Sequence, residues 1–405
     1  VGAGAANQID LDAIAGTAGG TASDLTINTT GVVSVAEAVS TDIGNVTVTQ
    51  SGGTTFEAVD TTTDVVLTNT TGTIAFNGAL VTPTLTTASQ GYGVSLKGGS
   101  TITNAVTFSN TGTTQIGDAT ADTNTFNGGV TATAGAVTAA GNVVTSADNL
   151  VLGAVTLVDG QNLILNTNAG GAGDITVASI TGVAGGTAEN VTLVSGTGTI
   201  GVTGNIGTDI ATLALQENTG TVSGAVTLGG DVTAATLSTF AQGYAGSLTG
   251  TTNQITNAVT FANTGALTLG DGADTTNFAG GLTATAPSGI TAQGIVKADG
   301  GTGVLTLGDT DTGLAVSGDL TVGGTSTGTI SLGDATLVDG ATLTVGAGAA
   351  NQIDLDAIAG TASGTVSNLI INTTGVVTVA EALGTDFGTV TITNSGGTTF
   401  SNTLT

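Results

Sequence analysis

Apolar and polar residues alternate with a period of two along almost the whole chain. Segments such as Val46-Thr47-Val48, Val106-Thr107-Phe108 and Val191-Thr192-Leu193 place apolar side chains on one face and threonine on the other. Gly or Asn follows each segment within a few residues. This pattern predicts short, half-buried strands separated by turns.

The chain also repeats itself on a long period. Residues 1–56 return without a gap at 345–400, which sets a period of 344 residues. The long repeat therefore occupies 1–344 and restarts at 345–405. Repetition on this scale favours a stacked architecture, so we expect one continuous solenoid over 1–405, as an excerpt of a longer repeat array.

Shorter echoes lie inside the long period. The segment that begins at Gln90 is echoed from Gln242, and the segment that begins at Leu152 is echoed from Leu332. Strong strands recur at multiples of about 20 residues, which is typical of one turn of a β-solenoid. The expected fold is all-β: a right-handed parallel β-helix of about 20 coils, on the order of 100 Å long at one strand spacing per coil.

Tandem antiparallel β-sandwich domains are the alternative fold. Asn127-Gly128 and Asp159-Gly160 are dipeptides of the kind that close two-residue hairpins. However, the chain has no Trp and only nine Phe, whereas a sandwich core usually recruits large aromatic residues. The narrow interior of a solenoid suits Val, Ala and Leu better.

Composition supports strands and opposes both helix and disorder. The chain holds 68 Gly and is 39% hydrophobic but only 8% charged, so it differs from the polar, charged sequences that stay unfolded. Residues that favour helices, such as Glu, Lys, Arg and Met, are scarce or missing. Without Cys, disulfides cannot supply stability.

Charge narrows the range of partners. The net charge is −27, and only Lys97 and Lys297 oppose 29 acidic residues, so the chain repels phosphate backbones and anionic lipid surfaces. No apolar run approaches the roughly 20 residues of a membrane-spanning helix. We therefore expect neither nucleic-acid binding nor direct membrane insertion.

The strand motifs resemble those of the filamentous haemagglutinin-like large exoproteins and adhesins of bacteria. The shared features are segments such as Asn190-Val191-Thr192-Leu193 and the recurring G-x-V/I-x-V/L pattern, over the whole chain. The resemblance implies a β-helical, extracellular filament or surface stalk that supports adhesion, aggregation or a biofilm matrix. It implies partners in further repeats of the same chain, surface glycans or other cells, and it transfers no catalytic residue.

Catalytic chemistry has few candidates in this sequence. The absence of His, Cys and Arg excludes His-based triads, thiolate nucleophiles and arginine clamps. Asp10 and Asp12 lie on one strand face roughly 7 Å apart, a separation that glycosidase carboxylates use. The pair recurs as Asp354 and Asp356, and recurrence suits a structural element better than a single active site. We expect no enzyme and assign no catalytic, cofactor-binding or metal-binding residue.

Calcium is the one cofactor that the sequence leaves open. Oxygen-rich clusters occur at Asp118/Asp122/Asn124, Asp271/Asp274/Asn277 and Asp309/Asp311, and Gly170–Ile175 approaches a calcium-binding nonapeptide. None of them forms a complete loop signature, and turns are the simpler interpretation. A multivalent module that binds calcium, ice or glycans is therefore the alternative function.

Three further motifs have ordinary structural interpretations. The segment 196–201 matches G-x-G-x-x-G, but strand and turn residues follow it where a dinucleotide site needs a helix. Outward threonines such as Thr47/Thr49 and Thr131/Thr133 would form an ice- or carbohydrate-facing surface or simply the solvent face of strands. Glycosylation sequons begin at Asn28, Asn45, Asn69, Asn190 and Asn372, where stacked turn asparagines are the simpler expectation.

Overall fold

The computed structural model describes the chain except residues 5, 168–170, 218–219, 221, 363 and 403–405. Two compact units, Val1–Ile200 and Gly201–Thr405, are described one at a time. The described residues contain strands and turns but no helix, and they form a β-solenoid of about 18 turns. All the strand pairings described are parallel, which confirms the parallel β-helix and makes the antiparallel sandwich wrong.

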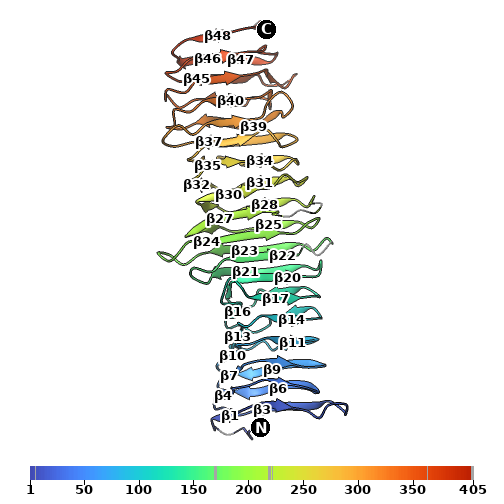
Figure 1. Cartoon of the computed structure of the whole chain (residues 1–405). Coiled ribbons are helices and arrows are strands. Elements are labelled where there is room, and N and C mark those ends of the chain that lie inside the picture. The colour runs from blue at the N-terminus through green and yellow to red at the C-terminus, as the bar shows by residue number, and fades with distance from the viewer. Residues whose placement is uncertain (5, 168–170, 218–219, 221, 363, 403–405) are drawn as a thin grey trace. The chain divides into compact units, whose positions relative to one another are not determined.

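In unit 1, each turn crosses three faces, and successive turns form a parallel ladder on each face (Figure 1). The first face holds β1 (Ile9–Leu11), β4 (Val33–Val35), β7 (Thr54–Phe56), β10 (Thr73–Phe76), β13 (Gly93–Leu96), β16 (Thr114–Ile116) and β19 (Val137–Ala139). The second holds β2 (Ile14–Ala15), β5 (Val39–Ser40), β8 (Val59–Asp60), β11 (Leu80–Thr82), β14 (Ser100–Ile102), β17 (Thr123–Phe126), β20 (Gly141–Thr145), β22 (Leu163–Asn166) and β24 (Glu189–Val194). The third holds β3 (Ser23–Asn28), β6 (Ile43–Ser51), β9 (Asp64–Thr70), β12 (Thr84–Thr87), β15 (Val106–Thr107) and β18 (Val130–Ala132). The long strands β21 (Leu150–Leu157) and β23 (Ile175–Thr181) run from the third face into the first face of the next turn.

Unit 2 has the same three-sided plan. One side holds β27 (Ile210–Leu215), β30 (Thr236–Thr239), β33 (Val259–Thr260), β36 (Leu282–Ala284), β38 (Leu305–Leu307), β40 (Ile330–Leu332), β43 (Ile353–Leu355), β46 (Val377–Val379) and β48 (Thr398–Phe400). The next holds β28 (Val226–Leu228), β31 (Gly246–Leu248), β34 (Leu267–Leu269), β41 (Ala335–Leu337) and β44 (Ile358–Gly360). The last holds β26 (Ile206–Gly207), β29 (Thr233–Ala234), β32 (Thr252–Ile255), β35 (Thr275–Phe278), β42 (Thr342–Val345), β45 (Ser367–Asn372) and β47 (Phe387–Asn394). β37 (Ile290–Lys297) and β39 (Leu314–Gly323) span two sides, and β25 (Ile200–Val202) lies at the sequence boundary of the units.

The turns differ in length because corner loops vary. Val94 pairs with Thr114, twenty residues further on, whereas Leu165 pairs with Leu193, twenty-eight residues further on. The turns are therefore longer on average than the predicted 20 residues, and the chain makes about 18 turns, not about 20. Asn127-Gly128 and Asp159-Gly160 lie at such corners between parallel strands, not in hairpins.

The core of each unit consists of inward side chains stacked turn upon turn. In unit 1, one stack runs through Val35, Phe56, Phe76, Leu96 and Ile116, all of them buried. The rings of Phe56 and Phe76 lie parallel, with centroids 5.2 Å apart and planes 12° apart. Since burying one such side chain contributes about 1.5–3 kcal/mol, these stacks are a main source of stability.

Buried polar side chains at one corner satisfy the backbone of the neighbouring turn. In unit 1 the Thr29 hydroxyl donates to the Asn7 carbonyl at 2.9 Å and accepts from the Gly31 N–H at 3.0 Å. In unit 2, Thr373 donates to the Ala349 carbonyl at 2.9 Å and accepts from the Gly375 N–H at 2.9 Å. Unpaired buried backbone groups cost free energy. This Ser/Thr/Asn-x-Gly corner therefore lets the chain bend while its backbone groups keep hydrogen-bond partners.

Repeated segments fold alike. The strands β1, β3 and β6 of residues 1–56 have counterparts in β43, β45 and β47, 344 residues later, including the register shift near the start of β3 and β45. The shorter echo also has equivalent aromatic packing. Phe108 meets Phe126 edge to face at 6.2 Å, and Phe261 meets Phe278 in the same way at 6.1 Å.

Both tyrosines of the chain lie in the shorter echo, and both are held by equivalent hydrogen bonds. The Tyr92 hydroxyl accepts the Ala88 N–H at 2.8 Å and donates to the Leu67 carbonyl at 2.9 Å. Tyr244 is held in the same way, with the Phe240 N–H and the Leu215 carbonyl at 3.4 Å each. Burial raises the pKa of Tyr92, and it raises the pKa of Tyr244 to about 12.

The first prediction concerns close approach at the glycine corner. A Cβ added to Gly112 would overlap the backbone of Tyr92 and Gly91 in the turn before, so Gly112→Ala should destabilise the fold by about 1–3 kcal/mol or more. Gly91→Ala is the matched control, because a Cβ at Gly91 points into open space. Thermal melting followed by circular dichroism measures both, and equal melting temperatures would contradict the packing described here.

The second prediction concerns the buried tyrosines. Burial raises the pKa of Tyr244 from the ordinary 10.0 of a tyrosine to about 12, so the stability that this buried hydroxyl contributes is complete below about pH 10 and is lost as pH rises toward 12. Tyrosinate absorbance should therefore appear late, together with a loss of stability. Tyr244→Phe should reduce the pH dependence and leave the part that Tyr92 contributes, and a tyrosinate signal already half-complete at pH 10 would refute this prediction.

Candidate functional surface

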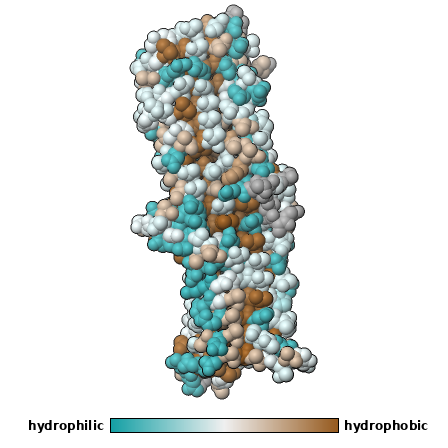
Figure 2. Space-filling model, viewed as in Figure 1, coloured by the Kyte–Doolittle hydropathy of each residue, from teal (hydrophilic) through white to brown (hydrophobic). Residues whose placement is uncertain are grey.

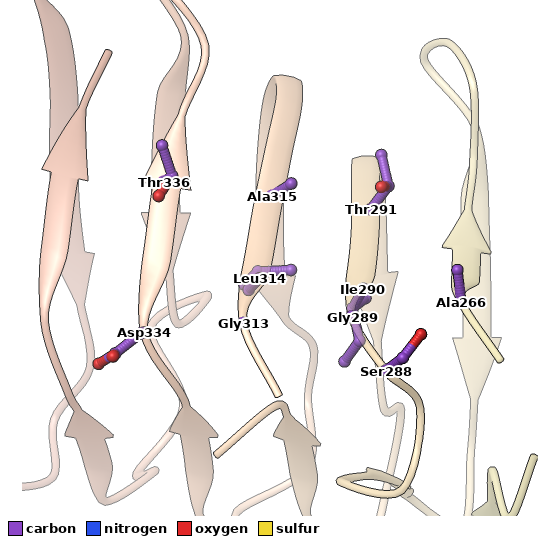
Figure 3. A pocket seen from close by; sticks show the side chains of 10 residues that line it. All are labelled: Ala266, Ser288, Gly289, Ile290, Thr291, Gly313, Leu314, Ala315, Asp334 and Thr336. Atoms are coloured by element: carbon purple, nitrogen blue, oxygen red, sulfur yellow. The ribbon is translucent and has the colours of Figure 1, made fainter. Parts of the chain in front are cut away.

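Unit 2 carries a shallow surface groove of about 480 Å³ that is open to solvent. It crosses β34, β37, β39 and β41, and Figure 3 shows Thr291, Ala315 and Thr336 at one level on neighbouring strands. These three residues are register partners on the outward face of the ladder. Ser288 and Asp334 lie further along it. The groove is thus a shallow depression between adjacent turns and not an enclosed pocket.

Unit 1 carries a similar groove of about 330 Å³ over β15, β18 and β21. Thr107 and Thr131 are its outward register partners, and Asp148 and Asn149 lie at its edge. Thr131 is one of the outward threonines expected from the sequence, and Thr47 likewise lies outward on β6, next to Thr26. The residues that line either groove do not include a carboxylate, a nucleophile and a base together.

A longer row of hydroxyl side chains follows one side of unit 2. These outward residues occupy successive strands from β33 to β48 and are partly or fully exposed. In register order the row is Thr260, Thr283, Thr306, Ser331, Asp354, Thr378 and Thr399. The spacing along it is that of neighbouring strands, about 4.8 Å.

The carboxylates considered for catalysis have structural partners. The Gln8 amide donates to both carboxylate oxygens of Asp10 at 3.2 Å, and the Gln352 amide donates to those of Asp354 at 3.1 and 2.9 Å. The same contact thus recurs in both copies of the repeat, on an exposed strand face. This recurrence is the behaviour expected of a structural element.

Asp356 belongs to a column of acidic side chains in unit 2. Asp309, Asp334, Asp356 and Glu381 each follow by one or two residues the end of neighbouring strands β38, β40, β43 and β46. Burial raises the pKa of Asp356, and the like charges of Asp334, Glu381, Asp309 and Asp354 raise it further. Repulsion between the like charges of successive turns therefore destabilises the folded chain at this column.

The oxygen clusters considered for calcium form turns. One Asp122 carboxylate oxygen accepts the N–H groups of Asp118 and Ala119 at 2.8 Å each. Asp274 accepts those of Asp271 and Gly272 at 2.8 and 3.1 Å. Asp309 does the same for Asp311 and Thr312 at 3.0 and 2.8 Å. In the part of the chain that the structure describes, no group of three acidic side chains gathers as a metal site would require.

Both lysines lie next to an aspartate. The Lys97 Nζ lies 3.8 Å from the Asp118 Oδ2, and the Lys297 Nζ lies 2.7 Å from the Asp299 Oδ2. The hydrogen bond from Lys297 lowers the pKa of the Asp299 carboxyl below its usual range. The few positive charges are thus paired locally with acidic neighbours.

The glycine-rich motifs also take structural roles. Gly170 lies outside the described residues, and Asp174 of the same segment accepts the N–H and hydroxyl of Thr199 at 2.7 and 2.8 Å. The G-x-G-x-x-G segment runs directly into β25, so it lacks the helix that a dinucleotide site needs. Among the sequons, Asn69 and Asn190 are exposed.

The corner residues were missed in the sequence, although a signal was present. Thr29-Thr30-Gly31, Asn110-Thr111-Gly112 and Asn263-Thr264-Gly265 share a small polar residue two positions before glycine. Asparagines at these corners donate to carbonyls of the preceding turn, as Asn110 does to Tyr92 at 3.3 Å and Asn263 does to Tyr244 at 3.2 Å. Each of these two asparagines thus bonds to the backbone of the preceding turn.

Comparison of the chain with family models, with curated proteins and with solved structures finds no match. The chain is therefore placed by its architecture alone, as a β-helical repeat protein. None of the described residues forms a helix that is long and apolar enough to cross a membrane.

The third prediction concerns the acidic column. Because the folded-state pKa of Asp356 is raised, the stability linked to it is present at acidic pH and lost as pH rises through that pKa. Asp356→Asn should therefore raise the free energy of unfolding at neutral pH by less than about 1 kcal/mol, seen as a higher melting temperature, and the gain should vanish in acid. Asp60→Asn is the control, because Asp60 is exposed on β8 and its register partner on the next strand is Val81. A gain that is the same at both pH values would exclude the charge explanation.

Proposed function

We propose that this chain is a structural repeat segment of an extracellular bacterial filament or surface stalk, of the filamentous haemagglutinin-like kind. Such a segment would support adhesion, aggregation or a biofilm matrix by extending a stiff scaffold. The observation that carries the proposal is the duplication: residues 1–56 and 345–400 fold into the same turns, one period apart. A stack built in this way lengthens by adding periods.

The outer surface supports a scaffold role. Among the described residues, both tyrosines and six phenylalanines are buried, and the other three phenylalanines are only partly exposed, so the surface there offers few stacking platforms for sugars or bases. Figure 2 shows hydrophilic residues in small groups among neutral and apolar ones on the face in view. The net charge of −27 disfavours nucleic acid and anionic membranes as partners.

A multivalent binding module is the second candidate function, favoured by the hydroxyl row of unit 2. From Thr260 to Thr399, evenly spaced hydroxyl groups present a repeated pattern to solvent, interrupted by Asp354. Such a row suits an ordered water layer or a glycan chain. A change in ice-crystal shape in the presence of the protein would favour this candidate over a passive scaffold.

The fourth prediction tests the scaffold by its axial repeat. At about 18 turns in 405 residues, one 344-residue period holds about 15 turns, or on the order of 75 Å at about 4.8 Å per turn. Electron microscopy of the native surface assembly, labelled with an antibody against residues 144–149, a corner whose Ser146, Asp148 and Asn149 are exposed, should show label at that spacing along thin fibres. Label on separate globules joined by flexible linkers would reject the scaffold function.

A further inference from the structure

Six dipeptides of the chain can in principle react with their own backbone. In an Asn-Gly or Asp-Gly dipeptide, the glycine nitrogen can attack the side-chain carbonyl carbon of the residue before it, because glycine has no side chain to hinder the approach. The attack closes a five-membered succinimide ring. The chain has two Asn-Gly and four Asp-Gly dipeptides, which begin at Asn77, Asn127, Asp159, Asp271, Asp299 and Asp339.

In five of the six dipeptides, a hydrogen bond holds the glycine nitrogen in place. The Gly78 N–H donates to the Glu57 carbonyl of the turn before. A nitrogen that must first give up such a bond reacts more slowly. The other four acceptors are the Glu189 Oε1 for Gly160 at 3.0 Å, the Asp274 Oδ2 for Gly272 at 3.1 Å, the Thr325 hydroxyl for Gly300 at 2.9 Å and the Thr365 carbonyl for Gly340 at 2.7 Å.

Gly128 is the exception. Asn127 and Gly128 are the central residues of a β-turn, which the Gly129 N–H closes on the Phe126 carbonyl at 2.9 Å. The N–H of the second central residue has no acceptor within such a turn. Within the part of the chain that the structure describes, no acceptor from another turn takes its place. The Gly128 nitrogen is therefore free to approach the Asn127 side chain.

The Asn127 side chain also has a donor at the atom where charge would develop. The hydroxyl of Ser146, the first residue after β20, donates to the Asn127 Oδ1 at 2.8 Å. Attack on the Asn127 Cγ moves negative charge onto this oxygen. A donor already in place stabilises that charge as it forms, so Ser146 favours the attack.

We propose that Asn127 is a self-modification site of the folded chain, at which the side-chain amide is converted to a carboxylate. The Gly128 nitrogen loses its proton to hydroxide and forms a bond to the Asn127 Cγ. The bond from Cγ to Nδ2 then breaks, and Nδ2 takes a proton from water and leaves as ammonia. Water opens the succinimide at either carbonyl and yields aspartate or isoaspartate. This inference goes beyond the proposed function and does not depend on it.

The reaction changes a packed corner of unit 1. Both products place a new negative charge between β17 and β18, where Asp148 lies close to Gly129. Isoaspartate also lengthens the main chain by one methylene group. The Gly128 Cα lies so close to the backbone of Asn104 and Ala105 that an added Cβ would overlap both, so the longer chain must shift this corner.

Unit 2 has the same turn without the reactive residue. In the shorter echo, Ala279 stands in the place of Asn127, and the Gly281 N–H closes the turn on the Phe278 carbonyl at 2.8 Å. The turn therefore does not need asparagine. Asn127→Ala is thus a control variant that keeps the corner and removes the reactive amide.

The fifth prediction compares Asn127 with Asn77 in the folded, full-length chain at mildly alkaline pH. Asn127 should convert at least about tenfold faster than Asn77, because only the Gly78 nitrogen must break a hydrogen bond before it attacks. Mass spectrometry of peptides, cut with pepsin in acid so that no further succinimide forms, measures the exchange of the amide for a carboxyl at each site. Enzymatic methylation of isoaspartate counts that product separately.

Urea provides the reference state. In urea that unfolds the chain, as followed by circular dichroism, Asn77 and Asn127 should convert at similar rates, because neither glycine then keeps its folded-state contacts. Asn127→Ala should release less ammonia than the parent chain while its melting temperature stays the same. Equal conversion of Asn77 and Asn127 in the folded chain, or conversion of Asn127 in urea alone, overturns the proposal.

Ser146→Ala tests the donor. Loss of the hydroxyl should slow conversion of Asn127 in the folded chain by about twofold to tenfold and leave the rate in urea unchanged. A variant that merely loosened the fold would instead speed conversion at both Asn77 and Asn127. An unchanged or faster rate at Asn127 in folded Ser146→Ala rejects the part that Ser146 plays in the reaction.

Discussion

Parallel backbone pairing between successive turns is the constraint on which the rest of this structure depends. It places each side chain one strand spacing from its counterpart in the next turn, so that inward side chains stack on inward ones and outward on outward. The ring stack of Phe56 and Phe76 is the favourable consequence. The raised pKa of Asp356, under the like charges of Asp334 and Glu381, is the unfavourable one.

The same constraint explains the corners. A chain that bends three times per turn carries backbone groups into the interior, and these need partners there. Thr29 and Thr373 supply them with a hydroxyl that both donates and accepts. Glycine follows two residues later, because the bend brings it against the preceding turn: a side chain on Gly31 would overlap the Asn7 carbonyl.

Much of the fold could be predicted because its cause is local and repeated. Alternation in segments such as Val46-Thr47-Val48 identifies the buried face, and the return of residues 1–56 at 345–400 identifies a stack. Turn length could not be predicted from this pattern, because the loop that carries Leu165 to Leu193 lies outside the strands that alternate. The role of Asp122 could not be predicted either. In the sequence, a carboxylate that accepts N–H groups of a turn cannot be told from one that binds a metal ion. For the surface, the sequence indicated outward threonines but not that Thr260 and Thr399 belong to one row.

The equivalence of the two copies has a consequence for inheritance. Recombination out of alignment between the coding regions of residues 1–56 and 345–400 would add or remove one 344-residue period. Because β6 and β47 occupy the same place in the stack, the new junction joins a turn to the neighbour it already fits. Such an event would change the length of the molecule by a whole period and keep the strand pairing at the junction.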